Sequence, residues 1–381
     1  MRIAFFVQYC HEAGTYFRWH NLAKALVLLG NEVDIYAGDF NYKAKKRIEQ
    51  RDGVRYLITP SLITCRIFGN PSDPFTALYR VVQKSYGKYD VYHLFQPFLQ
   101  AYLPWRFKKY FSKGLFCYDW DDLWTGGIFK KITNLRENYV FWLVKKLESS
   151  IPKQANATSI CSSFLQKKLA NIKHSIILPN GFWPASKNQY NKQLNLFIKA
   201  NNHFYIGYIG KTAAELDWII EAANLLKDKK IVFIIAGPNK QQVEKSGLLI
   251  MPNMKYLGEV TPEEAKTLTS DLDLALLPLE DTSFNQSRFP IKFFDYLNAG
   301  TPVFYSGVGE LKSIAANTSF VYEGGSTKTE WIKNLINLLD DIINQPKPLI
   351  DISQLEDTYS WKAIASLLLK YYQQHSQKNY A

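Results

Sequence analysis

Short apolar runs alternate with longer amphipathic segments along the chain, and this alternation restricts the fold more than any other feature of the sequence. The runs of the first half are Ile3–Val7, Glu32–Tyr36, Val54–Ile58, Asp90–Phe95, Gly114–Tyr118, Ala157–Cys161 and Ser175–Leu178. They are rich in β-branched and aromatic residues and do not alternate strictly between polar and apolar, which is typical of strands buried on both faces of a parallel sheet. The segment Trp19–Leu29 is predicted to be a helix between two such strands, with Gly30 at the usual stop position.

The same rhythm restarts in the second half. The predicted strands there are Phe204–Ile209, Ile231–Ala236, Lys255–Gly258, Leu272–Leu277, Pro302–Tyr305 and Ser319–Tyr322. Between the halves, the stretch Pro184–Asn202 is rich in Asn, Gln, Lys and Ser, and it is predicted to be a linker. A length of 381 residues exceeds the usual size of one domain. The two βαβ series therefore predict an α/β protein of two doubly wound, Rossmann-like domains that face each other across a cleft.

Charge is distributed unevenly between the two halves. Residues 1–190 hold 27 Lys and Arg against 13 Asp and Glu, a net charge of +14, whereas residues 191–381 hold 19 against 21, a net charge of −2. A basic first half predicts an anionic partner, such as a lipid headgroup surface, a diphosphate-linked acceptor or a nucleic acid. No nucleic-acid-binding module is recognisable, so we predict no nucleic-acid partner. The alternative is a high isoelectric point without a specific partner.

Three basic and aromatic stretches of the first half indicate a membrane surface: Trp105–Phe111, Lys130–Arg136 and Tyr139–Lys146. Bulky apolar and cationic side chains together are typical of peripheral contact with an anionic membrane. No stretch reaches the roughly 18 consecutive apolar residues of a spanning helix. The alternative is a set of helices whose apolar sides pack inward. We predict a cytoplasmic protein at the inner face of the cell membrane, and the four widely spaced cysteines agree with a reducing compartment.

The segment Phe289–Val303, with the sequence FPIKFFDYLNAGTPV, carries the sharpest functional signal. Pro290 is predicted in the first turn of a helix, where its missing N–H is not needed. The free backbone N–H groups of that turn, the helix dipole and the Lys292 ammonium together make a phosphate site. Asp295 lies one turn further on nearly the same face, where its carboxylate can accept hydrogen bonds from ribose hydroxyls. The alternative is an ordinary amphipathic helix with a surface Lys–Asp pair.

This segment resembles the donor-binding helix of GT-B glycosyltransferases of the broad GT4-type superfamily (glycosyltransferase group 1), whose common pattern is P-x-K-x-x-E-Y-x-A-x-G-x-P-V. Further segments resemble the family in the expected order: Tyr208–Lys211, Phe233–Pro238, Lys255–Val260 and Tyr359–Lys362. The resemblance is weak across the first half. It implies a GT-B fold with an acceptor-binding domain at 1–190, a nucleotide-sugar donor-binding domain at 200–359, and a C-terminal helix within 360–381 that packs back on the first domain.

The resemblance also implies which residues hold the donor. The expected donor-binding residues are Gly210, Lys211, Gly258, Glu259, Val260, Ser287, Arg288, Pro290, Lys292 and Asp295. Many relatives place two glutamates eight positions apart, the first near the donor sugar and the second on the ribose, and here these positions are Ser287 and Asp295. Arg288 is expected to add a phosphate contact, with an ordinary surface charge as the alternative. The nucleotide diphosphate sugar is the expected co-substrate, with no other cofactor and no obligatory metal ion.

Polar residues follow two predicted strands of the first half. Asp119, Asp121 and Asp122 come directly after the strand that ends at Tyr118. Because clustered carboxylates raise one another's pKa, Asp122 or Asp121 is the expected general base for an acceptor hydroxyl, with Asp119 structural. A helix N-cap is the alternative for this cluster. His93, near the end of another strand, is the second catalytic candidate, although a lone histidine there is more often structural.

The loop after the first strand is a weaker candidate. Gly14 allows close backbone approach to the diphosphate or the acceptor across the cleft, and Thr15 lies beside it. Arg18 follows in the opening turns of the next helix and is expected to reach the cleft. A plain strand–helix turn is the alternative.

Together these features predict a metal-independent glycosyltransferase of the hexosyltransferase type. It would move a sugar from a nucleotide diphosphate sugar to a hydroxyl of a lipid-linked or membrane-surface glycan, as in polysaccharide biosynthesis. One alternative is a catalytically silent protein of the same fold that binds nucleotide sugars or tethers to membranes, which the missing first glutamate favours. Another is a nucleotide-sugar 2-epimerase, against which the charge asymmetry counts.

Overall fold

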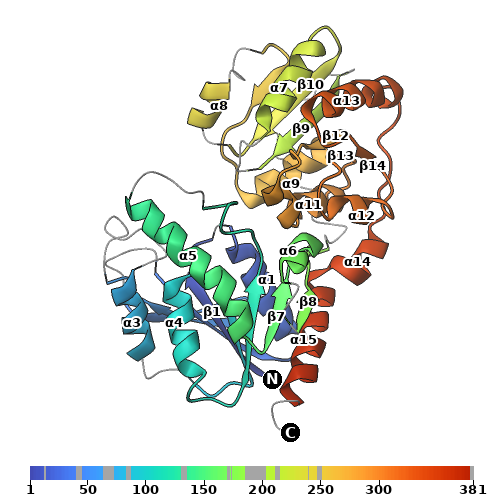
Figure 1. Ribbon diagram of the computed structural model, residues 1–381. Coiled ribbons are helices and arrows are strands. Elements are labelled where there is room, and N and C mark those ends of the chain that lie inside the picture. The colour runs from blue at the N-terminus through green and yellow to red at the C-terminus, as the bar shows by residue number, and fades with distance from the viewer. Residues whose placement is uncertain are drawn as a thin grey trace. The chain divides into compact units, whose positions relative to one another are not determined.

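The computed structural model describes residues 1–12, 14–39, 45–62, 73–82, 87–129, 135–169, 172, 174–184, 203–210, 215–238, 240–246 and 251–377. These residues form two compact units, each built on its own sheet (Figure 1). The first unit holds Met1–Gly181 and Tyr359–Ala381, and the second holds Phe182–Thr358. Both sheets are mainly parallel with helices between successive strands, which confirms the predicted fold class of two Rossmann-like domains. The predicted linker at 184–202 lies almost wholly outside the described residues.

The sheet of the first unit has the strand order β3-β4-β2-β1-β5-β6-β7-β8. Its strands are β1 (Arg2–Tyr9), β2 (Glu32–Gly38), β3 (Arg47–Arg51), β4 (Val54–Thr59), β5 (Val91–Phe95), β6 (Leu115–Trp120), β7 (Ala157–Ile160) and β8 (Ser175–Ile177). Its helices are α1 (Tyr16–Leu28), α3 (Pro74–Val82), α4 (Leu99–Lys108), α5 (Leu135–Gln154), α6 (Ser163–Lys168) and α15 (Trp361–Gln377). The strand order reverses between β1 and β5, and in such sheets ligands bind outside the carboxyl ends of the strands at this point.

Neighbouring residues of β5 show how helices cover both faces of this sheet. Tyr92 stacks on Phe116 of β6 with ring centroids 4.6 Å apart, and its carbonyl accepts a hydrogen bond from the indole of Trp105 on α4. The next residue, His93, points to the other face and meets Tyr372 of α15. Because successive side chains of a strand point to opposite faces, α4 and α15 cover opposite sides of the sheet.

Strand β3 was missed by the sequence analysis. It pairs antiparallel with β4 at the edge of the sheet, with Arg47 opposite Ile58 and Arg51 opposite Val54. Its sequence RIEQR is mostly charged and half exposed, so it contains no apolar run that marks a buried strand. A charged edge strand is also a common protection of a sheet against pairing with another chain.

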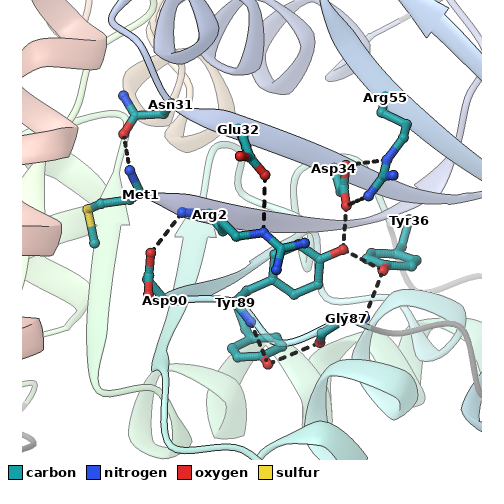
Figure 2. Close-up of polar contacts among 11 residues, drawn as sticks. Met1, Arg2, Asn31, Glu32, Asp34, Tyr36, Arg55, Gly87, Tyr89 and Asp90 are labelled. Carbon is teal, nitrogen blue, oxygen red and sulfur yellow. Dashed lines mark hydrogen bonds and ion pairs between the residues drawn. The ribbon is translucent and has the colours of Figure 1, made fainter.

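A polar network joins the amino ends of several strands of the first unit (Figure 2). The backbone N–H of Arg2 in β1 donates to Asp90 just before β5, at 2.8 Å. On β2, the carboxylate of Asp34 accepts from the guanidinium of Arg55 on β4 and from the hydroxyl of Tyr89. This end of the sheet lies opposite the carboxyl ends at which ligands bind, so we interpret the network as structural.

The second unit has a parallel sheet with the order β11-β10-β9-β12-β13-β14. Its strands are β9 (Phe204–Ile209), β10 (Ile231–Ala236), β11 (Met254–Tyr256), β12 (Leu274–Leu277), β13 (Val303–Tyr305) and β14 (Val321–Glu323). Its helices are α7 (Leu216–Leu225), α8 (Lys240–Ser246), α9 (Pro262–Asp271), α10 (Ser283–Ser287), α11 (Ile291–Asn298), α12 (Leu311–Ala315), α13 (Lys328–Ile342) and α14 (Ser353–Tyr359). The order reverses between β9 and β12, which places the expected ligand site at the carboxyl ends of these two strands.

Candidate functional site

Three glycines make the turns at the carboxyl ends of β9, β10 and β11. Gly210 donates to the carbonyl of Ala236 at 2.8 Å, and Gly237 donates to the carbonyl of Gly258 at 2.7 Å. A Cβ atom added to Gly237 would lie 2.8 Å from the carbonyl carbon of Gly210, so the first two turns are in backbone contact. Gly237 and Gly258 also have positive φ angles of 104° and 80°, which glycine adopts without strain. The result is a row of three turns without side chains of their own, and the space at Gly258 is open to a ligand that approaches the backbone.

Lys292, in the first turn of α11, extends over the first of these turns. A Cβ atom added to Gly210 would lie 2.0 Å from the Lys292 Nζ, so a larger residue at position 210 would displace this side chain. The Nζ atom also lies 5.4 Å from the ring centroid of Tyr208. Among the described residues, no hydrogen bond or ion pair engages the ammonium group. Burial lowers the pKa of Lys292, while the charge of Asp295 opposes that shift.

Helix α11 is held in this position by the Tyr296 hydroxyl, which hydrogen-bonds to both backbone groups of Ile209. The Tyr296 hydroxyl accepts from the Ile209 N–H at 3.2 Å and donates to the Ile209 carbonyl at 3.1 Å. Tyr296 is one turn after Lys292, so this clamp fixes the start of the helix at the end of β9. Pro290 is at the N-cap of α11, with φ −70° and ψ 107°, one position earlier than predicted. The difference does not change the arrangement, because the first N–H groups of the helix are still without intrahelical partners.

Asp295 follows one turn after Lys292 and its side chain is exposed. Protein atoms around the carboxyl group nevertheless restrict its hydration and raise its pKa to about 6, while the charges of Lys292 and Lys266 oppose this shift. The carboxylate makes no hydrogen bond to another described residue. Because its pKa is about 6, the carboxyl group is mostly ionised at neutral pH, and it is available to hydroxyl donors.

Ser287 and Arg288 differ in what they can offer a ligand. Ser287 is fully buried, and its hydroxyl donates to the carbonyl of Phe284 at 2.7 Å. The structure thus uses this hydroxyl inside α10 and does not present it at the surface, contrary to the expected donor contact. Arg288 lies with its guanidinium 4.7 Å from the ring centroid of Phe284, and its charge lowers the pKa of both Lys292 and Glu215. Arg288 is therefore part of one electrostatic cluster with Lys292.

Glu215 was not singled out from the sequence. It precedes α7 with a left-handed backbone, φ 58°, which is uncommon for a residue with a side chain and is often found at functional sites. Its Oε1 atom accepts from the Glu280 N–H at 3.2 Å and from the Asn285 amide at 3.0 Å. Burial raises the pKa of Glu215, against the opposing charge of Arg288. The Glu215 carboxyl group thus lies against Asn285 of α10, two positions before Ser287 in the sequence.

The other expected donor residues lie around the same strand ends. Glu259 is exposed and Val260 half-buried, directly after the glycine turn at Gly258. Lys211 lies outside the described residues.

Arg18 is a core residue of the first unit. This is contrary to the prediction that its side chain reaches a ligand. Its Nε and Nη2 atoms form a paired contact with the Asp119 carboxylate at 2.7 and 2.9 Å. The same guanidinium donates to the carbonyl of Leu178 at 2.8 Å and to Asn180 at 2.9 Å. Both charged side chains are almost completely buried, with 3% and 0% of their surface exposed. The pair therefore joins α1, β6 and the segment after β8, and Asp119 is structural in the way that the sequence suggested.

Breaking this pair should destabilise the protein strongly. We expect Asp119→Ala to lower the free energy of unfolding by about 3–5 kcal/mol, because it leaves a buried guanidinium without its counter-charge. Urea unfolding at pH 7 measures this. The matched control is Glu32→Ala, which removes an exposed partner of Arg2 in the same sheet and should cost less than about 1 kcal/mol. Equal losses in the two variants would contradict a structural role of the buried pair.

His93 is likewise internal. It has no exposed surface, its Nδ1 atom meets the Tyr372 hydroxyl, and its Nε2 atom lies 3.4 Å from the Ser159 hydroxyl. Burial lowers the pKa of His93 to about 4, against the opposing charge of Asp119, so the imidazole is neutral at physiological pH. The catalytic role considered for His93 is therefore corrected to a structural one, since no acceptor can reach a ring enclosed between β5 and α15.

Asp121 and Asp122 follow β6 and differ sharply in their surroundings. Asp121 is buried, and its Oδ1 atom has no hydrogen-bond partner among the described residues. Burial, followed by the charges of Asp122 and Asp119, raises the pKa of Asp121 well above its ordinary value, and the charge of Arg18 only partly opposes this. Asp122 is half-buried and thus better hydrated. Burial and the neighbouring carboxylates thus favour the neutral form of the Asp121 carboxyl group.

The loop after β1 meets the end of β5 at the point where the strand order reverses. Gly14 is exposed with φ 59°, and a Cβ atom there would meet nothing within 4 Å. The Thr15 hydroxyl accepts a hydrogen bond from Gln96, which itself has a left-handed backbone with φ 71°. Glycine is therefore required at position 14 by its backbone angle and not by crowding, and the space above it is open.

Two Rossmann-like units, with the C-terminal helix returned to the first, define the GT-B architecture. Residues 202–341 match the family model described as Glycosyl transferases group 1. This match lies within the second unit, and it confirms the family resemblance seen in the sequence of that unit.

Relatives and solved structures agree with this assignment. Over 197 residues the chain is 25% identical to TuaH of Bacillus subtilis (strain 168), which is assigned to teichuronic acid biosynthesis as a glycosyltransferase. That match covers 49% of each protein, so the chain spans about half the length of the curated relative that it matches. Sucrose-phosphate synthase from Thermosynechococcus elongatus superposes with a TM-score of 0.71 at 15% identity over 98% of each chain. Anabaena HepE in complex with UDP and glucose superposes with a TM-score of 0.60 at 14% identity over 99% of each chain. At these identities the solved structures show the fold.

Proposed function

We propose that this protein is a glycosyltransferase that moves a sugar from a nucleotide diphosphate sugar to an acceptor hydroxyl. The observation that carries the proposal is the Lys292 ammonium, which lies over the glycine turn at Gly210 and next to the N-terminus of α11, without an ion pair to any described residue. A cation and free backbone N–H groups at one point are what a diphosphate requires. The family of the second unit and the relative in teichuronic acid biosynthesis support the same reaction class.

In the proposed reaction, the bond between the anomeric carbon of the sugar and the diphosphate oxygen breaks, and the acceptor oxygen forms the new bond to that carbon. Lys292, Arg288 and the first N–H groups of α11 stabilise the negative charge that develops on the leaving diphosphate. We expect these cations, with Lys211, to do this without an obligatory metal ion. Asp295 accepts hydrogen bonds from the ribose hydroxyls, and Asp122 takes the proton of the acceptor hydroxyl.

The acceptor is proposed to be a lipid-linked or membrane-surface glycan at the inner face of the cell membrane. The net charge of +14 on residues 1–190 supports an anionic acceptor carrier on the first unit. The pathway named for the relative TuaH supports a polysaccharide precursor as acceptor. UDP is the first nucleotide to test, because HepE was solved with UDP and glucose.

Thermal unfolding with UDP, GDP, ADP and their common sugar conjugates tests the donor site. Ligand binding to the folded state alone should stabilise the protein by about 2.7 kcal/mol at a hundredfold excess over Kd, so one nucleotide should raise Tm clearly.

The matching radiolabelled sugar nucleotide is then incubated with and without total membrane lipid from the producing cells. Label transferred to lipid, with release of the nucleoside diphosphate, supports glycosyl transfer. Binding without turnover would instead indicate the silent protein, conversion of the sugar nucleotide without lipid would indicate an epimerase, and no Tm shift would contradict the donor site.

A further inference from the structure

Helices α3, α4 and α5 form one layer over one side of the sheet in the first unit (Figure 1). Helices α4 and α5 are joined where the Tyr102 hydroxyl donates to the Gln154 side chain at 2.9 Å. Six of the large apolar side chains that the layer and the turn after α4 expose, each with 44% to 70% of its surface accessible, are Phe75, Leu78, Phe107, Tyr110, Phe111 and Trp142. We call these six residues the aromatic face. Ordinary surfaces show such side chains singly, so this number on one layer indicates a contact surface.

The exposed residues are those left over after each helix has packed on the sheet. On α4, Trp105 is fully buried while Phe107 is exposed, and on α5, Val144 is buried while Trp142 is exposed. The inward-packing alternative considered for the sequence stretches therefore holds for one side of each helix only. Helix α3 was not among those stretches, and residues 130–136 lie outside the described side chains.

The charges around the aromatic face are almost all positive. Residues 99–113 contain four Lys and Arg and no Asp or Glu, and the one charged residue of α3, Arg80, is buried. Helix α5 adds four cations and two glutamates, of which Glu148 is buried and accepts hydrogen bonds from the Trp120 indole and the Trp124 N–H. Cations also stack on the exposed rings, with Arg106 4.5 Å from the Tyr110 ring centroid and Lys146 5.1 Å from that of Trp142.

This composition discriminates between possible occupants of the surface. A second copy of the chain would bring the same cations against themselves, which opposes pairing. A nucleic acid would satisfy the cations and stack on rings, but it offers nothing to Leu78. An anionic bilayer offers both a negative surface for the cations and an interfacial region for the apolar side chains. Among the described residues, no helix is long and apolar enough to cross a membrane.

We propose that the aromatic face of the α3–α4–α5 layer docks the first unit on an anionic phospholipid surface. The apolar side chains enter the headgroup region, and the surrounding Lys and Arg neutralise lipid phosphates. This inference identifies the surface that brings the protein to a membrane-borne acceptor, but vesicle binding requires neither nucleotide nor turnover. Failure of the docking proposal and failure of the proposed reaction are therefore distinguishable.

The experiment is sedimentation of the full chain with vesicles of phosphatidylcholine alone or mixed with phosphatidylglycerol. We expect binding to the mixed vesicles, little binding to phosphatidylcholine, and loss of binding at high salt because surface charges are screened. The triple variant Phe107→Ser, Tyr110→Ser, Phe111→Ser should lower the vesicle partition coefficient at least tenfold. The matched control is Leu28→Ser, Leu225→Ser, Leu349→Ser, which removes three exposed leucines, with 60% to 96% of their surface accessible, on other parts of the surface. It should bind like the wild type.

Several outcomes would overturn the proposal: no binding to anionic vesicles, equal binding by the triple variant and the wild type, or an equal loss in the leucine control. A salt-stable dimer that the triple variant abolishes, without vesicle binding, would assign the face to a second copy. If the triple variant melts at a lower temperature, Lys113→Glu with Lys145→Glu, both on exposed side chains, makes the same test through charge. Lys292→Ala should bind vesicles normally in every case.

Discussion

Replacing Lys292 with alanine is expected to weaken binding of the preferred nucleoside diphosphate by roughly 100-fold, equivalent to about 3 kcal/mol. The physical reason is that the ammonium lies over the Gly210 turn without a hydrogen bond or ion pair to another described residue, so a bound diphosphate becomes its counter-charge. Stability should change little, because burial lowers the pKa of Lys292 and the folded protein gains nothing from holding this charge. Titration calorimetry with UDP, GDP and ADP measures the affinity, and urea unfolding measures the stability.

Two further variants make this test specific. Lys266→Ala removes an exposed cation whose charge reaches Asp295 but which is not at the glycine turn, and it should leave the affinity nearly unchanged. Gly210→Ala should displace the Lys292 side chain, because the new Cβ atom would lie 2.0 Å from Nζ. In the Lys292→Ala background the same substitution should cost much less, so the two effects are coupled in a double-mutant cycle. Additive losses would show that the alanine methyl blocks the ligand directly and that Lys292 does not mediate the effect.

The second large effect is expected at the carboxylate pair after β6. Asp122→Asn should lower the rate of sugar transfer to membrane lipid by roughly 10² to 10⁴-fold, because an amide cannot accept the proton of the acceptor hydroxyl. Asp121→Asn should lower it much less, because burial raises the pKa of Asp121 and favours its neutral form, which an amide resembles. Nucleotide affinity should be the same in both variants, as neither residue belongs to the second unit. A larger loss from Asp121→Asn would transfer the base to Asp121.

Stability gives an independent measure of the state of Asp121. Its pKa is raised in the folded protein, so between its ordinary unfolded value and the folded value the native state binds more protons than the unfolded state. The free energy of unfolding contributed by this group is therefore greatest at low pH and declines as the pH rises. Asp121→Asn removes this slope. The free energy of unfolding of the variant minus that of the wild type should therefore be more positive at pH 8 than at pH 5. Urea unfolding of both proteins at both pH values measures this difference. A difference that does not change with pH would contradict the prediction.

The sequence identifies those strands that are buried, because their residues form a continuous apolar run. β1, β9 and β10 are continuous apolar runs and were predicted within a few residues. The edge strand β3 escaped because its residues alternate between half-buried and exposed and are mostly charged, so only its pairing with β4 defines it. The sequence pattern thus identifies interior strands better than edge strands.

The candidate donor site was accessible for a similar reason. Lys292 and Asp295 lie in one continuous segment, so their mutual spacing on α11 follows from helical geometry alone. Glu215 could not be found in this way, because Asn285, which positions its carboxylate, is 70 residues away in sequence. The roles of these residues stay predictions until the nucleotide measurements are made.

The first unit shows the opposite limit. Arg18 and His93 were considered for a ligand site because polar residues near strand ends often serve function, but each is enclosed by partners distant in sequence. Asp119 is 101 residues from Arg18, and Tyr372 is 279 residues from His93. Burial of a polar residue by such contacts leaves no local trace in the sequence.

The return of α15 to the first unit has a consequence for how the chain is made. Trp361, Leu368 and Tyr372 are buried in that unit, so its hydrophobic core lacks one side until the last segment has been synthesised. The second unit, Phe182–Thr358, is continuous and has all its strands before then. During translation from the N-terminus, the second unit can therefore fold before the first unit is complete. Until α15 is available, the side of the first sheet that α15 covers stays exposed.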